Sequence, residues 1–238
     1  ETIPARIQQG ESFENVLLQG IDLSGLDLRK ANLRQAILVE ANLQGADLRE
    51  ANLTGAILCK ANLTNARLAD AQCGEADLTE AMLDSADLTG ASLTQATLER
   101  CSALGAKFNR VSAAGANLTQ ADLSGAQFQQ AQLAEADFSK CKLVGCSFRQ
   151  SDMQQCMLTG AQGSHVDFTA SNLTGARAAG GCDLPQANFQ QVQAAESNWS
   201  DANLPQADFA YARMPGAFFS GACLEKANFF AAGARRAR

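Results

Sequence analysis

The chain has 238 residues, of which 46% are hydrophobic and 18% charged, and its formal net charge is −6. No stretch approaches the roughly 20 consecutive apolar residues of a membrane-spanning helix, and no secretion signal is visible. The acidic balance also argues against direct binding of nucleic acid, because phosphate backbones attract basic surfaces.

Residues 1–10 lie outside the pattern that fills the rest of the chain, and they predict a short N-terminal capping helix. Pro4 suits the first turn of a helix, and Ile3 and Ile7 would lie on one side of it. Such a cap would cover edges that the first structural unit otherwise presents to solvent.

From Phe13 to Ala178, and again from Leu184 to Phe229, the sequence repeats every five residues. The central residue of a unit is usually Leu or Phe, and the residue two places earlier is usually Ala. Helices need apolar residues at a period near 3.6 and strands at 2, so neither fits. We therefore expect a chain that turns after each unit and encloses a narrow apolar core.

Units such as Ala46-Asp47-Leu48, Ala61-Asn62-Leu63 and Ala121-Asp122-Leu123 resemble those of the pentapeptide-repeat proteins. The resemblance covers most of the chain. It implies an all-β fold, a right-handed quadrilateral parallel β-helix with four units to a coil. On this interpretation residues 11–238 form one solenoid of about 11 coils, roughly 50 Å long.

Residues 20 apart behave as a column, which supports four sides per coil from this sequence itself. Leu28, Leu48, Leu68 and Leu88 begin one column. Seven aromatic residues continue it, and the last three follow a one-residue insertion: Phe108, Phe128, Phe148, Phe168, Phe189, Phe209 and Phe229.

Acidic residues precede many unit centres. Six acids between residues 70 and 87, at several positions of the unit, form a candidate acidic surface: Asp70, Glu75, Asp77, Glu80, Asp84 and Asp87. One interpretation is structural, because short polar side chains suit turn corners. The other is imitation of DNA phosphates, as the resemblance to gyrase-binding quinolone-resistance proteins implies. Basic stretches at residues 107–110 and 140–149 interrupt the acidic pattern, and duplex DNA carries one charge per about 1.7 Å, so the imitation would be incomplete.

Two regions break the regularity. Between Gly163 and Cys182, Gly163 and Ala178 replace large core residues, and an insertion near 179–183 shifts the frame; it is either a tolerated bulge or a binding feature. Near the C-terminus, Tyr211, Phe218 and Phe230 fall at outward positions. They form a candidate patch for a partner or for a homodimer through this end, or they pack on sequence beyond residue 238.

Candidate catalytic and metal-binding chemistry is sparse. His165 is the single histidine and has no expected nucleophile nearby, so we predict no enzyme activity. Most of the eight cysteines replace inward residues, while Cys59 and Cys223 should be exposed. We expect no disulfide, metal or cofactor, and a reducing cytoplasm as the setting. The first residue is not Met and the last unit is incomplete, which suggests a piece of a longer chain; secretion then stays open.

The sequence therefore predicts a non-catalytic protein-interaction or scaffold module of a bacterial pentapeptide-repeat protein, with protein partners, no direct nucleic-acid contact and no membrane span. The family resemblance also implies a role as the repeat domain of a larger protein linked to secretion or effector delivery. The alternative is a DNA-mimicking protein that binds gyrase or topoisomerase.

Overall fold

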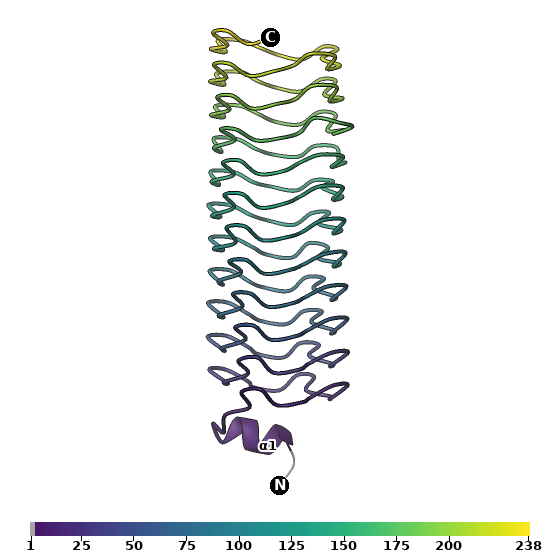
Figure 1. Cartoon of the computed structure of the whole chain (residues 1–238), viewed down its shortest axis with the longest axis vertical. Helices are drawn as coiled ribbons and strands as arrows, with labels where there is room; N and C mark the ends of the chain where they lie inside the picture. The colour runs from purple at the N-terminus through teal and green to yellow at the C-terminus, as the bar shows by residue number, and fades with distance from the viewer. Residues whose placement is uncertain (1–2) are drawn as a thin grey trace.

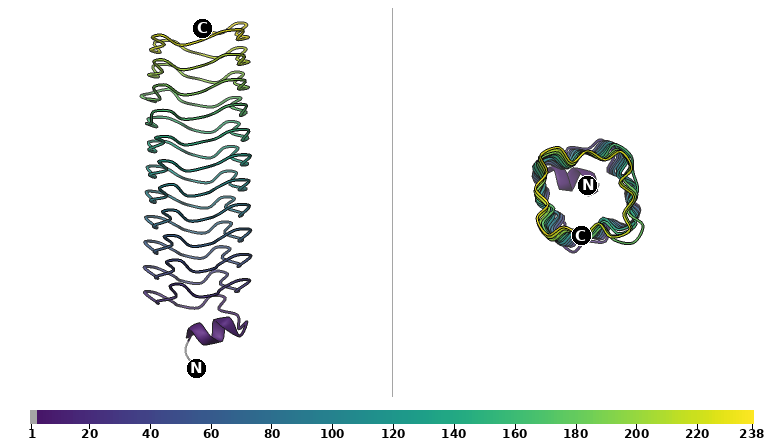
Figure 2. Two further views of the ribbon diagram at one scale, coloured as in Figure 1. Left: turned by 180° about the vertical axis from the view of Figure 1, so that it is seen from behind. Right: turned by 90° about the horizontal axis from the view of Figure 1, so that it is seen from above.

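The computed structural model describes residues 3–238, in which one short helix precedes a chain that coils into a straight rod (Figure 1). The helix, α1 (Ile3–Gln8), is the only one in these residues. Residues 1 and 2 of the expected N-terminal segment lie outside the described part. Seen along its axis, the rod has a four-sided outline (Figure 2).

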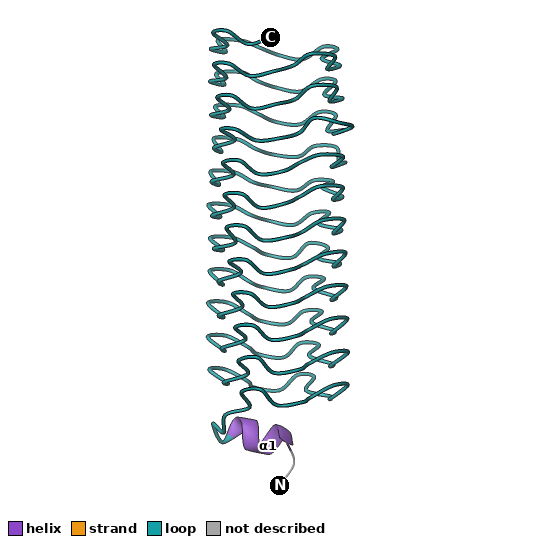
Figure 3. Ribbon diagram, in the orientation of Figure 1, coloured by secondary structure: helices purple, strands orange, loops and turns teal. Residues whose placement is uncertain are grey.

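Parallel bridges between residues 20 apart hold successive coils together, so each coil has four five-residue sides. The sides are named here after the central residues of one coil: Leu33, Leu38, Leu43 and Leu48. Each side makes one isolated bridge to the coil above and one to the coil below, and the described residues contain no longer strand (Figure 3). The expected strands are therefore reduced to single bridge residues.

The reason lies in the five-residue unit, of which two residues form the corner. The second corner residue has a positive φ in almost every unit, for example 64° at Gly55 and 58° at Lys60. A positive φ at that place is the geometry of a type II turn. Only about three residues of each unit are then left to run along a side.

Hydrogen bonds account for all five backbone N–H groups of a regular unit, as residues 51–55 illustrate. One N–H closes the corner, three bond to neighbouring coils, and the fifth is capped by a side chain. These bonds are Ala51 to Leu48 O (3.0 Å), Asn52 to Ala31 O (2.9 Å), Leu53 to Gln72 O (2.7 Å), Thr54 to Asn52 Oδ1 (3.0 Å) and Gly55 to Gly74 O (2.9 Å). Backbone donors are thus paired without a conventional sheet.

The core is a column of fully buried side chains, with the large central residue and the small residue of each unit pointing inward. The seven Phe residues of the 20-residue column form one continuous ring stack on the Leu48 side. Successive ring centroids from Phe108 to Phe229 are 4.6, 5.0, 5.3, 5.0, 4.6 and 4.9 Å apart. The stack continues across the insertion without a break. Phe229, in the last coil, is 40% exposed.

Helix α1 lies across the N-terminal end of the rod and inside its outline (Figure 2). Ile7 is buried, Ile3 packs against the same core, and the Arg6 guanidinium lies 5.4 Å from the centre of the Phe13 ring. Arg6 also pairs with Glu11. The helix is where the sequence places it, and its capping role stays a prediction.

The inserted residue is absorbed at one corner, where Gly180 and Gly181 have φ values of 80° and 89°. Bridges that cross it join residues 21 apart, from Gln162↔Asp183 to Arg177↔Asn198, and the spacing then returns to 20. The corner projects beyond the outline of the rod (Figure 2). Gly163 is close-packed: a Cβ there would lie 2.5 Å from the Leu143 carbonyl carbon.

Candidate functional site

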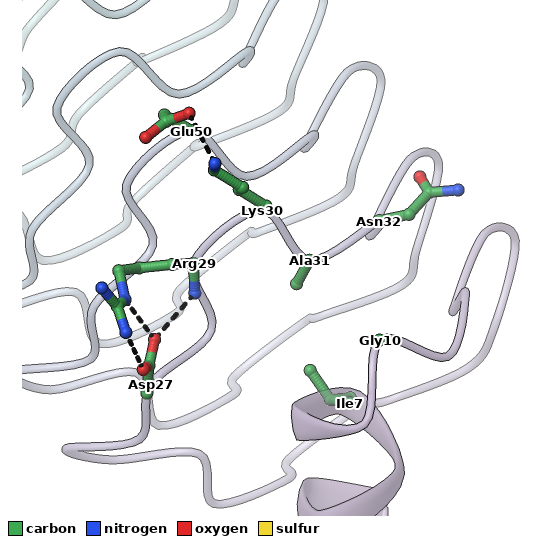
Figure 4. Close-up of a pocket in the computed structure, with 8 residues that line it drawn as sticks. All are labelled: Ile7, Gly10, Asp27, Arg29, Lys30, Ala31, Asn32 and Glu50. Atoms are coloured by element: carbon green, nitrogen blue, oxygen red, sulfur yellow. Dashed lines mark hydrogen bonds and ion pairs between the residues drawn. The ribbon is translucent and has the colours of Figure 1, made fainter.

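One open hollow, of about 790 Å³, lies between α1 and the first coils (Figure 4). Its charged side chains pair with one another: Arg29 Nη2 lies 2.5 Å from Asp27 Oδ2, and Lys30 Nζ lies 3.5 Å from Glu50 Oε2. The four charged side chains that line this hollow are thus paired with one another.

The Asp and Asn residues that precede unit centres act as caps within the fold. Asp22 Oδ1 accepts the Ser24 N–H at 3.1 Å, and Asp77 Oδ1 accepts the Thr79 N–H at 3.0 Å. The Arg29 guanidinium, together with the Arg29 N–H, lowers the pKa of Asp27 to about 2. These carboxylates therefore serve the corners, which favours the structural interpretation of the acidic pattern.

The six residues of the candidate acidic surface do not share a face. Asp77 and Glu80 lie on the Leu38 side, Asp70 and Asp87 on the opposite Leu48 side, and the other two, Glu75 and Asp84, lie on the sides between them.

Several of these six acids are also engaged within the rod. Glu80 pairs with Lys60 at 3.7 Å and with Arg100 at 3.1 Å. Asp84 accepts the Ser102 hydroxyl at 2.6 Å and the Leu104 N–H at 3.0 Å.

The three outward aromatic residues near the C-terminus form two separate features. Tyr211 and Phe230 are 55% and 65% exposed and meet edge to face, with ring centroids 5.5 Å apart, at the corner that follows the Leu48 side. Phe218 lies on the opposite Leu38 side, where it bridges Asn198. The structure therefore brings together two of the three residues.

A second exposed apolar feature was missed by the sequence interpretation. Leu17, Ile37 and Ile57 bridge one another in three successive coils of the Leu38 side, and we call them the aliphatic ladder. Leu17 is 66% exposed and Ile57 37%. They occupy the position that in many other units carries a capping Asp or Asn. Reading that outward position at steps of 20 would have revealed the ladder from the sequence.

Groups with reactive side chains are scattered. His165 lies exposed at a corner, and its N–H donates to Pro185 O at 3.2 Å. All eight cysteines are free; burial raises the pKa of Cys73 and of Cys101 to about 12. Cys59 is half-buried, not exposed as expected, and burial and the neighbouring Asp77 raise its pKa to about 11. Within residues 3–238, no three His, Cys, Asp or Glu side chains gather as metal ligands.

A four-sided parallel β-helix with five-residue sides defines a class of solenoid proteins. Eight segments of this chain, most of them overlapping, match the pentapeptide repeats, and the chain belongs to that family. The matched segments are residues 17–55, 46–84, 61–100, 104–139, 114–150, 131–162, 146–182 and 187–225.

Solved structures of three pentapeptide-repeat proteins illustrate the range of similarity. HetL, involved in heterocyst differentiation regulation in the cyanobacterium Nostoc sp. strain PCC 7120, is 29% identical, with 95% of this chain and 92% of that chain covered and a TM-score of 0.35. QnrB1, a plasmid-mediated fluoroquinolone resistance protein, is 19% identical, with coverage of 90% and 89% and a TM-score of 0.38. A protein of the Arabidopsis thaliana thylakoid lumen is 29% identical, with coverage of 50% and 71% and a TM-score of 0.23.

Among curated proteins, no relative was found. In the part of the chain described, no helix has the length and apolar character needed to cross a membrane.

Proposed function

We propose that this chain is a non-catalytic protein-interaction module, a rod that presents side chains to protein partners at a fixed spacing. The observation that carries the proposal is the aliphatic ladder. Its three side chains contribute apolar surface on the outside of a rod whose interior is already filled, at a position where many other units have an Asp or Asn that caps a backbone N–H. Apolar surface kept at that cost is typical of a contact site.

The pair Tyr211 and Phe230 is a second contact site under this proposal, for a partner or for a second copy of the chain. Phe218 is not part of it, because it lies on the opposite side. The alternative, gyrase binding through DNA mimicry, has weaker support, since the six acidic residues face all four directions and Glu80 and Asp84 are already paired within the rod.

The aliphatic ladder can be tested by replacing Ile37 and Ile57 together with Asn. Asn is the residue that the fold uses at this position, as at Asn42 and Asn52, so the double variant should keep the rod and gain two caps. We expect wild-type rod immobilised as bait in a bacterial lysate to retain specific proteins that the variant loses, as measured by quantitative mass spectrometry.

A Tyr211→Ser, Phe230→Ser variant tests the second contact site in the same assay. Identical protein profiles for the wild type and both variants would contradict the proposal. Recovery of gyrase subunits by all three rods would favour the DNA-mimic alternative.

A further inference from the structure

Arginine residues before and after residue 177 differ in how often they are paired, although Arg110, in the first group, also has no ion pair in the described structure. Six arginines between residues 29 and 149 form ion pairs with carboxylates on the rod: Arg29, Arg34, Arg49, Arg67, Arg100 and Arg149. In the described structure, five arginines from residue 177 onward have no carboxylate within ion-pair distance: Arg177, Arg213, Arg235, Arg236 and Arg238. Positive charge is therefore left available at this end.

Three of these arginines surround Phe218 on the Leu38 side. Arg177 bridges Asn198, which in turn bridges Phe218, so Arg177 lies two coils before the ring. Arg238 lies in the next coil, where its N–H donates to Ala217 O at 3.0 Å. Arg236 lies at the adjoining corner. The Phe218 side chain is 40% exposed between them.

The surface around Phe218 is hollowed. Two open hollows, of about 510 and 430 Å³, share Phe218 and Glu196. The corner residues Gly175 and Gly216 line them and contribute no side chain, which leaves the groove open. We call this feature the Phe218 groove, with Arg177, Glu196, Phe218, Arg236 and Arg238 as its walls.

The chemistry of the groove selects an anionic partner with an apolar side chain. The side chains that line the two hollows include three guanidinium groups and one carboxylate, that of Glu196, so these side chains carry a net charge of +2. Guanidinium binds carboxylate by paired hydrogen bonds, and the face of an aromatic ring packs on apolar groups. The span from Arg177 to Arg238 covers three coil steps, about 14 Å, which four to five residues of extended peptide would cover.

Two other anionic occupants fit less well. Residues 1–100 of a second copy carry a net charge of −7, but many of their aspartates are engaged as caps, such as Asp22 and Asp77. A nucleic acid would have to lie along a protein of net charge −6, where the phosphates are repelled outside the groove.

We propose that the Phe218 groove binds an acidic peptide segment of a partner protein, with an apolar side chain on Phe218 and carboxylates on Arg177 and Arg238. This inference rests on the proposed function as an interaction module and names one surface and one class of partner.

The test is fluorescence anisotropy of the full chain with labelled synthetic peptides. The probe peptide has two glutamates at each end and a central phenylalanine, five residues in all. One control peptide replaces the phenylalanine with serine, and another replaces the glutamates with lysine. A duplex oligonucleotide of random sequence serves as the nucleic-acid probe. We expect the probe peptide to bind most tightly, and its affinity to fall roughly tenfold between low and high salt because the attraction is electrostatic.

Matched variants locate the site. Phe218→Asn places at the bridge position the residue already found at Asn198, so the rod should fold, and Arg177→Gln removes one guanidinium. Each should weaken binding of the probe peptide roughly tenfold. Arg149→Gln is the control, because Arg149 pairs with Asp167 on the opposite side; it should bind like the wild type.

Failure of the probe peptide to bind, equal binding of the serine peptide, tighter binding of the duplex, or equal binding by Phe218→Asn would overturn this inference. These outcomes do not by themselves contradict the proposed function as an interaction module, which the aliphatic-ladder variant tests. If the aliphatic-ladder variant loses lysate partners while the probe peptide does not bind, the module stands and the Phe218 groove does not.

Discussion

At the scale of single residues, three buried serines show how polar groups fit into a core built for alanine. Ser151, Ser171 and Ser197 occupy the small inward position. Ser197 Oγ donates to Ala194 O and accepts the Trp199 Nε1–H, both at 2.8 Å, and Ser151 Oγ donates to Phe148 O at 2.6 Å. Ser171 Oγ has no partner. A buried hydroxyl without a hydrogen bond costs stability, whereas Ser197 satisfies an indole that would otherwise be stranded.

This contrast predicts opposite effects for the same substitution. Ser197→Ala should lower the free energy of unfolding by about 1–3 kcal/mol, because the buried Trp199 N–H loses its acceptor. Ser171→Ala should leave that free energy unchanged or raise it, because the variant removes an unsatisfied hydroxyl. Ser151→Ala is the comparison variant, because the Ser151 hydroxyl makes one hydrogen bond, to Phe148 O. Chemical denaturation curves measure all three, and equal losses for Ser171→Ala and Ser197→Ala would contradict the argument.

At the scale of the five-residue unit, inward positions could be predicted from the sequence because each unit repeats the same orientation. Phe148 and Phe168 could be assigned to one stack by spacing alone. The number of bridge residues on each side could not be predicted from the sequence, because it depends on how many residues form the corner. Cys59 occupies an outward position but lies half-buried, because its environment is set by neighbouring coils.

To predict which outward residues lie close together, each unit must also be assigned to a side of the rod. Tyr211, Phe218 and Phe230 are close in sequence, yet Phe218 belongs to the opposite side. Their separation follows from the spacing of 20, once outward positions are read in columns as inward ones are. The Phe218 groove, in contrast, depends on which arginines are paired, and pairing is set by side-chain geometry that the repeat does not encode.

The capping carboxylates of these units predict acid sensitivity. Folding lowers the pKa of Asp22, Asp27 and Asp47 from 3.8, chiefly through hydrogen bonds from Ser24, Arg29 and Arg49, respectively. A group whose pKa is lower in the folded state contributes stability above its unfolded pKa and loses it as the pH falls. The thermal midpoint should therefore decrease between about pH 4 and pH 2, the lower bound being the pKa of Asp27.

Asp27→Asn isolates one such carboxylate. The amide oxygen can still accept the Arg29 N–H, but it neither titrates nor pairs with the guanidinium. We expect the variant to be less stable than the wild type at pH 7, and the difference to narrow as the pH falls from 4 to 2. Thermal unfolding followed by circular dichroism at several pH values measures this. A difference that stays constant over that range would show that the Asp27 charge contributes nothing to the fold.

At the scale of the whole molecule, the rod is quasi one-dimensional, since each coil contacts only its neighbours. Its continuity depends on every corner having at least the number of residues that a four-sided coil needs. The corner at Gly180 and Gly181 has one residue more than the others and projects outward, while the ring stack from Phe168 to Phe189 passes it at 5.0 Å. An added residue at a corner is therefore tolerated, because the corner can bulge into solvent.

A corner that lacks a residue cannot adjust by bulging into solvent. Two single deletions distinguish removal of an extra corner residue from removal of a required one. Deleting Gly181 returns the corner to the regular length, so the bridge spacing becomes 20 throughout and we expect the thermal midpoint to stay within about 4 °C of the wild type. Deleting Gly160 also removes a corner glycine of positive φ, but from a coil of regular length. That corner cannot close, so the coils on its two sides should no longer stack, and unfolding should become less cooperative.

The fluorescence of Trp199, which lies beyond both sites, measures the result. Its emission should stay that of a buried indole when Gly181 is deleted and shift to the red when Gly160 is deleted. Equal tolerance of both deletions would mean that the corner length does not set the register of the rod.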